Sequence, residues 1–306
     1  MLKIQKNIDI SKFSTLRVKA EAALYAAPEN FEDVPDLFRY IKAEGLSWEI
    51  LGAGSNALLS SRGIEGVLIH TRALDFVELG EDGLVEVGAG ILMPRFCAKM
   101  AQESLTGMEF MEGIPGTVGG GVVMNAGAHG SEMAKIFKSA KALNLETLEV
   151  ETFSYEDIQF KYRRSIVDPT KYFLISASFV LKQGNKEEIR EKIKANNTAR
   201  STHQPIKAWT CGCTFKNPDS NSAGKLIDEI GAKGLREGDF VVSEKHGNFF
   251  ENLGEGTSMD FCNLMRRVQK LAYEKKGIIL EPEVKRIGLF SEEEDLLWQP
   301  QKLLLT

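Results

Sequence analysis

The stretch that decides the fold runs from Gly107 to Gly130 and reads GMEFMEGIPGTVGGGVVMNAGAHG. Eight of these residues are glycine, which is entropically unfavourable in an ordered chain, so the backbone must bend sharply or approach another group closely. The segment 113–121 offers a run of bare backbone N–H groups, which in turn conformations form concavities suited to phosphate or pyrophosphate. Asn125 and the small residues after it would let a flat ring lie against the chain.

A plain glycine-rich turn between two strands is the alternative, because isolated glycine motifs often match by chance. A second loop upstream, Gly52–Ala57, favours a ligand instead, since it follows the apolar run Trp48–Leu51. It nominally fits the dinucleotide fingerprint G-x-G-x-x-G/A, but that fingerprint requires a helix straight afterwards. Here the chain reaches Gly63 and the strand-like Val67–His70 at once. We therefore predict a strand–loop–strand phosphate cradle and not a Rossmann unit.

The composition is that of a soluble globular protein large enough for two domains. The chain has 306 residues, 43% hydrophobic and 26% charged, with a net charge of −5, which gives no general attraction to nucleic acid or to an anionic membrane. No apolar run is long enough to span a membrane, and the N-terminus lacks a signal-peptide core. Four scattered cysteines and four histidines without ligand spacing indicate a reducing, cytoplasmic compartment and no bound metal.

Hydrophobic periodicity predicts the other elements. We expect a helix capped by Asn30 and ended by Gly45, a hairpin over 74–90, and a charged helix over 184–204 that marks a domain boundary. Further helices are expected at 93–104, 155–158, 223–230 and 257–277, and strands at 138–150, 172–183, 248–252 and 278–287.

Polar clusters supply candidate reactive groups, and each residue also has a purely structural interpretation. Arg163 could clamp a carboxylate in bidentate fashion, or belong to a surface arginine pair. Cys213 could donate a proton, or be a small core residue. Alternation would put Glu281 and Glu283 on one face of the last strand, although solvated charge is the more usual explanation.

Two further clusters could contact phosphate. Lys216 and Asn217 follow Cys213 and can bind phosphate or hydroxyl groups. Lys245 and His246 lie in a polar, glycine-containing segment that could equally be loop surface.

Taken in order, these pieces resemble the family of UDP-N-acetylenolpyruvoylglucosamine reductases, the MurB family of peptidoglycan precursor synthesis. The resemblance covers roughly residues 8–288, and seven or more motifs in family order make it specific. These motifs are LGAGSN at 51–56, GIPGTVGG at 113–120, MNAG at 124–127, YRRS at 162–165, GCTFKNP at 212–218, AGKLID at 223–228, SEKH at 243–246 and EV at 283–284.

The resemblance implies an α+β protein with an FAD-binding domain of the vanillyl-alcohol-oxidase (PCMH) type in two lobes and a C-terminal α+β substrate domain. The implied boundaries are residues 1–70 and 71–183 for the lobes and 184–290 for the substrate domain, with a tail at 291–306 of unknown role. It also implies that NADPH reduces the flavin, which then reduces UDP-N-acetylglucosamine enolpyruvate to UDP-N-acetylmuramate. The chain is expected to be a monomer that acts on these small molecules.

Site residues carry over position by position. Arg163 and Glu283 would steady the substrate carboxylate and the enolate, and Cys213 would protonate the neighbouring carbon. The substrate would contact Asn217 and, at its phosphates, Lys245 or His246. The cofactor-binding residues implied are Gly52, Ala53, Gly54, Ser55, Asn56, Gly116, Thr117, Gly119, Gly120, Asn125, Ala126 and Gly127.

Four positions depart from the family pattern. Many members carry serine where this chain has Cys213, but a thiol, with an unperturbed pKa of about 8.5, is a far stronger acid than an alcohol. Lys19 and Ala20 replace a usual pair of glycines, which puts nearby FAD contacts in doubt. Lys285 stands where arginine is common, which puts one anion contact in doubt.

Two rival functions remain open at this point. A histidine near the first loop that could link the flavin covalently would favour a different flavoenzyme on the same fold, such as an oxidase, but residues 52–66 contain no histidine. A non-enzymatic nucleotide-binding module would need no combination of Arg163, Cys213 and Glu283.

Overall fold

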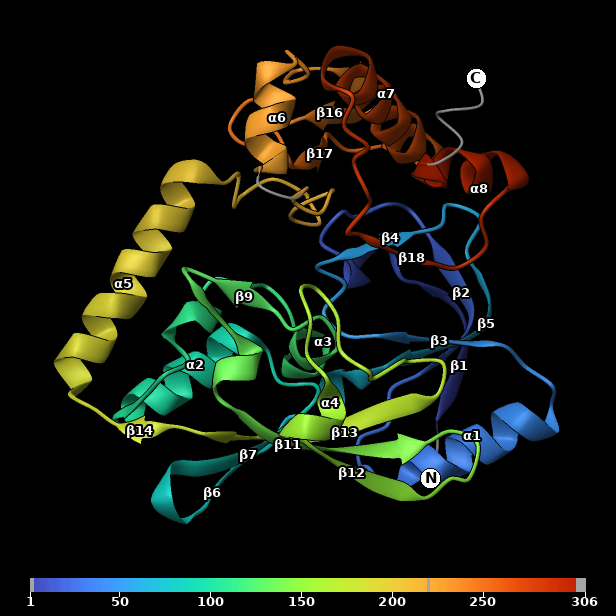
Figure 1. Cartoon of the computed structure of the whole chain (residues 1–306). Helices are drawn as coiled ribbons and strands as arrows, with labels where there is room; N and C mark the ends of the chain where they lie inside the picture. Colours follow the sequence, from blue (N-terminus) through green and yellow to red (C-terminus); the bar gives the residue numbers. More distant parts are fainter. Residues whose placement is uncertain (1–2, 219–220, 301–306) are drawn as a thin grey trace. The chain divides into compact units, whose positions relative to one another are not determined.

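A computed structural model describes residues 3–218 and 221–300, and the chain divides into two compact units (Figure 1). The first unit comprises residues 1–5, 25–53 and 67–200, and the second comprises residues 6–24, 54–66 and 201–306. Each unit is therefore assembled from segments far apart in the sequence. The division into two cofactor lobes, a substrate domain and a tail concerns ligand binding and stays a prediction.

The elements combine helices and strands, as the α+β prediction requires. The helices are α1 Asp33–Ala43, α2 Met93–Gln102, α3 Val118–Val123, α4 Tyr155–Ile158, α5 Lys186–His203, α6 Ala223–Glu229, α7 Ser258–Lys276 and α8 Glu292–Trp298. The strands are β1 Ile4–Asp9, β2 Glu21–Ala26, β3 Trp48–Leu51, β4 Ala57–Leu59, β5 Ile64–His70, β6 Val77–Leu79, β7 Leu84–Gly88, β8 Leu105–Thr106, β9 Gly127–Ala128, β10 Ser131–Glu132, β11 Phe137–Asn144, β12 Val150–Ser154, β13 Tyr172–Val180, β14 Lys182–Gln183, β15 Arg236–Glu237, β16 Phe240–Val242, β17 Phe250–Asn252 and β18 Lys285–Ile287.

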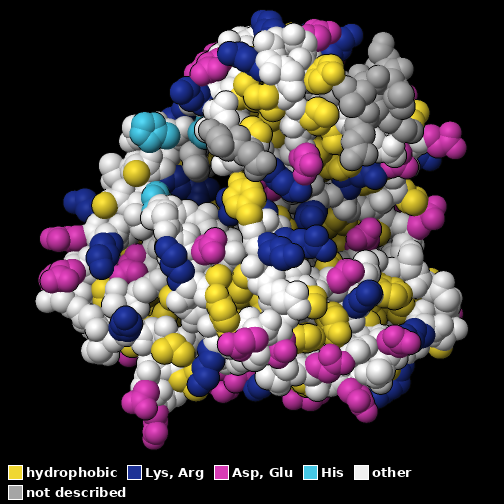
Figure 2. Space-filling model, viewed as in Figure 1, with side chains coloured by type: hydrophobic (Ala, Val, Ile, Leu, Met, Phe, Trp, Pro, Cys, Tyr) yellow, Lys and Arg dark blue, Asp and Glu magenta, His cyan; other side chains and the backbone are white. Residues whose placement is uncertain are grey.

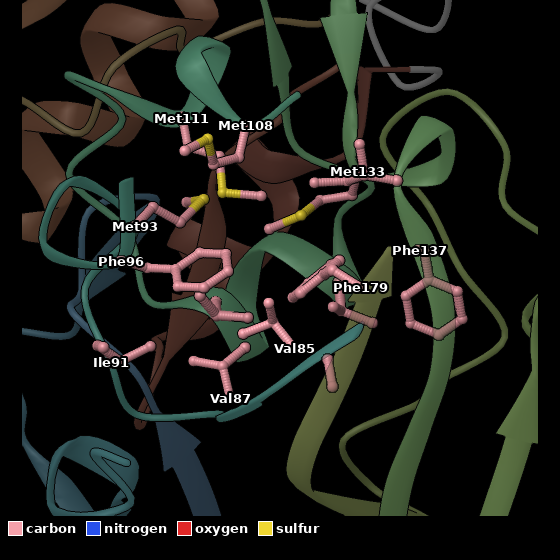
Figure 3. Close-up of a cluster of buried hydrophobic side chains, with 14 of the residues drawn as sticks. Val85, Val87, Ile91, Met93, Phe96, Met108, Met111, Met133, Phe137 and Phe179 are labelled. Atoms are coloured by element: carbon pink, nitrogen blue, oxygen red, sulfur yellow. The ribbon is translucent and has the colours of Figure 1, made fainter. Parts of the chain in front are cut away.

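The core of the first unit lies between a five-stranded antiparallel sheet, ordered β12-β11-β13-β7-β6, and helices α2 and α3 (Figure 1). The predicted hairpin is confirmed as β6 and β7, whose Val85 and Val87 are buried. The Phe96 ring of α2 contacts Phe179 of β13 at a centroid distance of 5.6 Å. Figure 3 shows methionine side chains, among them Met93, gathered beside Phe96, where their flexibility fills irregular space. This packing holds α3 in place.

The core of the second unit forms around α7, which packs against the antiparallel sheet β15-β16-β17 and against α8. Thr257 and Asp260 form a capping box at the start of α7, and Gly277 ends it at φ +67°, so the predicted helix is confirmed. The hydroxyl of Ser258 donates to the buried Glu294 of α8 over 2.5 Å. Part of the predicted tail is thus a packed helix.

Two local predictions are wrong. The residue before α1 is Glu32, and Asn30 supplies only its backbone carbonyl, which accepts from the N–H of Asp33. Within 278–287 the strand β18 covers only its last three residues. Pro282 has no N–H to donate to a ladder, so Glu281 and Glu283 are not alternate residues of one strand.

Candidate active site

The loop Gly52–Asn56 joins β3 to β4 directly, which confirms a strand–loop–strand unit without a Rossmann helix. Gly54 has a φ of +63°, in the left-handed region, and its carbonyl accepts a bond from the Thr15 N–H over 3.1 Å. A Cβ at Gly54 would lie 2.1 Å from the Phe13 carbonyl oxygen. Only glycine fits this bend.

The backbone N–H groups of this loop are the main candidate for binding an anion. Within the described part of the chain, none of the N–H groups of residues 52–56 donates a hydrogen bond to another protein group. The residues are buried or half-buried, so such groups are expected to have a partner. A diphosphate can accept several of these bonds at once, and the residues present therefore fit the phosphates of FAD.

Two buried side chains hold the start of the loop. The Gly52 carbonyl lies 3.1 Å from Nε2 of His70, whose Nδ1 lies 3.0 Å from the hydroxyl of Tyr25. Burial lowers the pKa of His70, outweighing the opposite effect of its bond to Gly52, so the ring is neutral at pH 7. Nε2–H then donates to Gly52 and Nδ1 accepts from Tyr25. The sequence analysis considered the histidines only as metal ligands, so this hydrogen-bonding role of His70 was not predicted.

The second glycine-rich segment is not the run of bare N–H groups that we expected. Thr117 caps α3 by accepting the Gly120 N–H over 3.1 Å. The N–H of Val118 donates to Ile91, that of Gly119 to Ala89 and that of Gly121 to Thr117, each to a carbonyl oxygen within 2.9 Å. These donors are used by the protein itself, so they are not available for a phosphate.

The glycines of α3 differ in what surrounds them. A Cβ at Gly119 would lie 2.9 Å from the Ala89 carbonyl oxygen, and one at Gly121 would lie 2.4 Å from Met133 Cε. Gly120 is exposed, and a Cβ there would meet only the Thr117 hydroxyl, at 3.4 Å. Gly119 and Gly121 are explained by packing, whereas Gly120 is not. A Cβ at Gly52 would lie 2.6 Å from the same hydroxyl, so the two segments meet there.

The segment after α3 was predicted to lie against a flat ring, and this stays a prediction. Asn125 is 2% exposed, and its amide already donates to the Lys161 carbonyl over 3.3 Å and accepts from the Ala134 N–H over 3.1 Å. Ala126 and Gly127 are half-buried. The backbone and the two small residues Ala126 and Gly127 are therefore the groups that remain to contact a flat ring.

Arg163 belongs to the first unit and is described there by itself. It is half-buried, and its guanidinium carbon lies 5.1 Å from the centre of the Tyr162 ring. Its φ is +54°, an uncommon conformation for a residue with a side chain. Strained positions of this kind cluster at functional sites.

Cys213 and Glu283 come together in the second unit. The Glu283 N–H donates to the carbonyl of Thr214 over 2.8 Å, and both side chains of the candidate pair are half-buried. Burial raises the pKa of the neighbouring Cys211 thiol, and electrostatic interactions with Cys213 and Glu283 raise it further. Cys211 is therefore a neutral, buried thiol, whereas Cys213 is partly accessible.

Asn248 and Asn56 fix the segments that carry this pair. The buried Asn248 amide accepts from the Phe215 N–H over 2.9 Å and donates to the Phe215 carbonyl over 2.8 Å. The Asn56 amide donates to the Glu283 carbonyl over 3.4 Å, and the Asn56 carbonyl accepts from the Lys285 N–H over 3.0 Å. The first glycine loop is thus bonded to the segment of the candidate catalytic glutamate. Sequence reasoning missed Asn248.

Of the predicted substrate contacts, Asn217 and His246 lie at the start of α6, and Lys245 bonds to a different segment. Asn217 is exposed, and its Oδ1 accepts from the Ala223 N–H over 3.0 Å. The His246 ring lies against Gly224, where a Cβ would be 3.0 Å from it, and burial lowers its pKa. Lys245 is exposed, and its ammonium donates to the Ser201 carbonyl over 2.6 Å.

The lysine at the family's paired-glycine position forms a surface ion pair. Lys19 contacts Glu255, and both side chains are more than two-thirds exposed, at 74% and 69%. Pairs of this kind contribute little to stability.

Two family models match the chain. The model for the UDP-N-acetylenolpyruvoylglucosamine reductase C-terminal domain covers residues 204–287, and an FAD-binding-domain model covers residues 22–149. These matches agree with the predicted fold class and place an FAD-binding segment around both glycine-rich segments.

Relatives match over almost their entire length. The UDP-N-acetylenolpyruvoylglucosamine reductase of Caldicellulosiruptor saccharolyticus is 37% identical over 93% of this chain and 92% of its own. That of Lachnoclostridium phytofermentans is 38% identical over 92% of each chain. The crystal structure of the corresponding enzyme from Thermus caldophilus superposes with a TM-score of 0.79 at 33% identity, covering 94% of this chain and 99% of that one.

Proposed function

The chain belongs to the UDP-N-acetylenolpyruvoylglucosamine reductase family, and we propose which of its residues carry out the reaction. It is an FAD-dependent oxidoreductase that uses NADPH to reduce UDP-N-acetylglucosamine enolpyruvate to UDP-N-acetylmuramate. The reaction belongs to peptidoglycan precursor synthesis. This resolves the choice against an oxidase and against a binding module.

The loop Gly52–Asn56 binds the diphosphate of FAD through its backbone N–H groups. Their lack of partners within the described chain supports this assignment, as does the left-handed Gly54 at the centre of the bend. We place the exposed Gly120 beside the flavin, where it presents no side chain, together with Gly116, Thr117, Gly119, Asn125, Ala126 and Gly127. Bound FAD would accept hydride from NADPH and deliver it to the methylene carbon of the enolpyruvyl group.

Cys213 and Glu283 act on the substrate after hydride arrives. The thiol of Cys213 donates its proton to the carbon next to the carboxylate, and Glu283 steadies the enolate. The observation that supports this pair is the hydrogen bond from Glu283 to Thr214, which sets the two segments side by side. Arg163 holds the substrate carboxylate by charge and bidentate hydrogen bonding. Asn217 and His246 contact the substrate around α6, with Lys245 nearby in sequence at its phosphates.

The test separates the two half-reactions under anaerobic stopped flow. Cys213→Ala is expected to leave flavin reduction by NADPH intact and to slow reoxidation by the UDP-sugar by about 10²- to 10⁴-fold, the usual contribution of a positioned proton donor. Glu283→Gln is expected to slow the same step. Cys262→Ala, which removes a buried thiol elsewhere, is the matched control. Equal slowing of both half-reactions by Cys213→Ala would remove this residue from the protonation role.

The partners and location follow from the chemistry. Figure 2 shows acidic and basic side chains interspersed on the face that it draws, and this mixed face does not favour nucleic acid as a partner. In the described residues no helix is long and apolar enough to cross a membrane. Because NADPH and UDP-sugars are made inside the cell, we propose that the enzyme is cytoplasmic. That the chain acts as a monomer stays a prediction.

A further inference from the structure

The turn that presents Arg163 is fastened to the end of helix α3 at both of its sides. Lys161 and Arg164 exchange two backbone hydrogen bonds, of 2.9 and 3.1 Å, so Tyr162 and Arg163 form the tip of a tight turn. Arg163 occupies the third position of this turn with a positive φ, where glycine or asparagine is usual. An arginine in this strained position needs support from its surroundings.

That support comes from two buried polar side chains. On one side, the Asn125 amide donates to the Lys161 carbonyl over 3.3 Å. On the other, the hydroxyl of Ser165 donates to the Val123 carbonyl over 3.0 Å. Asn125 is 2% exposed and Ser165 is 8% exposed, so solvent competes little with these bonds.

The anchor for both bonds is itself rigid. Val123 is the last residue of α3, and Asn125, two residues later, has a φ of +43°, a conformation that asparagine tolerates. The second amide atom of Asn125 accepts the Ala134 N–H, so its orientation is fixed. The Lys161 carbonyl and the Ser165 hydroxyl are therefore held by one short segment of the glycine-rich stretch.

We propose that Asn125 and Ser165 are positioning residues that aim the guanidinium of Arg163 at the substrate carboxylate. This inference rests on the proposed role of Arg163. Neither residue touches the reacting atoms in this account; each acts by holding the turn that carries Arg163. The segment behind the flavin thereby also orients the group that binds the substrate.

The test is a double-mutant cycle on flavin reoxidation by the UDP-sugar, with product affinity measured by calorimetry. Ser165→Ala is expected to slow reoxidation and weaken product binding by roughly three- to tenfold, as loss of one neutral hydrogen bond would. Flavin content and reduction by NADPH should stay unchanged. In an Arg163→Ala background, Ser165→Ala should have no further effect, because it acts through the arginine.

Two variants complete the design. Asn125→Gly removes the amide while still allowing a positive φ. It should slow reoxidation at least as much as Ser165→Ala does, because it loses two hydrogen bonds. Since Asn125 is also placed beside the flavin, its reoxidation is compared at full FAD loading. Ser176→Ala removes another buried hydroxyl of the same unit, one that donates to Glu86 over 2.6 Å, and it should leave both half-reactions unchanged.

Each failure has its own signature. If Ser165→Ala reoxidises at the wild-type rate while Arg163→Ala is slow, the positioning role is wrong and the role of Arg163 stands. If the effect of Ser165→Ala persists undiminished without Arg163, the serine is merely structural and the proposal fails. If Arg163→Ala reoxidises at the wild-type rate, the proposed role of the arginine itself fails.

Discussion

In the loop Gly52–Asn56 no backbone N–H donates within the described chain, whereas from Val118 to Gly121 every backbone N–H does. Both segments are rich in glycine, and both lie within residues 22–149, which match the FAD-binding-domain model. The first uses glycine to make a bend that leaves donors free. The second uses glycine to bring a helix close to its neighbours. Glycine content alone therefore does not identify an anion site; what matters is where the N–H groups donate.

The largest effect is expected from Gly54→Ala. The new Cβ would lie 2.1 Å from a backbone oxygen at a φ of +63°, and the left-handed and overpacking penalties together come to about 3 kcal/mol or more. The free energy of unfolding and the flavin-to-protein ratio should both fall.

Gly45→Ala is the matched control for this substitution. Gly45 has the same φ of +63°, but a Cβ there would meet nothing within 4 Å. The free energy of unfolding should fall by only the conformational penalty, about 1–2 kcal/mol, and the variant should keep its flavin. Equal flavin loss in both variants would show that backbone strain, and not the shape of the first loop, controls cofactor binding.

The second segment should separate packing glycines from ligand glycines. Gly119→Ala should lower the melting temperature of the flavin-free protein, because its Cβ would crowd the Ala89 carbonyl by an amount worth about 1–3 kcal/mol. Gly120→Ala should instead raise the melting temperature, because alanine is favoured over glycine in a helix by up to about 1 kcal/mol. If Gly120 lies beside the flavin, the same variant should bind FAD about tenfold more weakly. Unchanged affinity would assign Gly120 no contact with the cofactor.

The smallest effect concerns pH and the support of the first loop by His70. Its pKa is lowered in the folded protein, so below about pH 6.5 the unfolded chain binds a proton that the folded chain does not. This contribution to stability is fully present above pH 6.5 and is lost as the pH falls, by at most about 1.4 kcal/mol per pH unit. His70→Gln, which keeps a donor for Gly52 but does not titrate, should show a shallower decline in chemical denaturation between pH 7 and 5. Identical slopes would contradict a neutral His70.

Much of this arrangement could be predicted from the chain itself. The strand Trp48–Leu51, the direct passage from the first loop into another strand and the extent of α7 all follow from local pattern and agree with the structure. The order of the motifs indicated the family, which the relatives confirm.

The rest depends on contacts between distant residues. Tyr25 reaches His70 across 45 positions, and the Asn125 amide is taken up by a carbonyl 36 positions away. No periodicity encodes such pairs. The second glycine segment was misread for the same reason, because the acceptors Ala89 and Ile91 of its N–H groups come from another part of the chain.

Amide hydrogen exchange of the flavin-free and FAD-reconstituted protein tests the central contrast most directly. The account predicts that the amides of residues 52–56 exchange rapidly without FAD and become protected when it binds, while those of residues 118–121 are protected in both states. Amides of the first loop that ignore FAD, or amides of the second segment that become protected only when it binds, would contradict it.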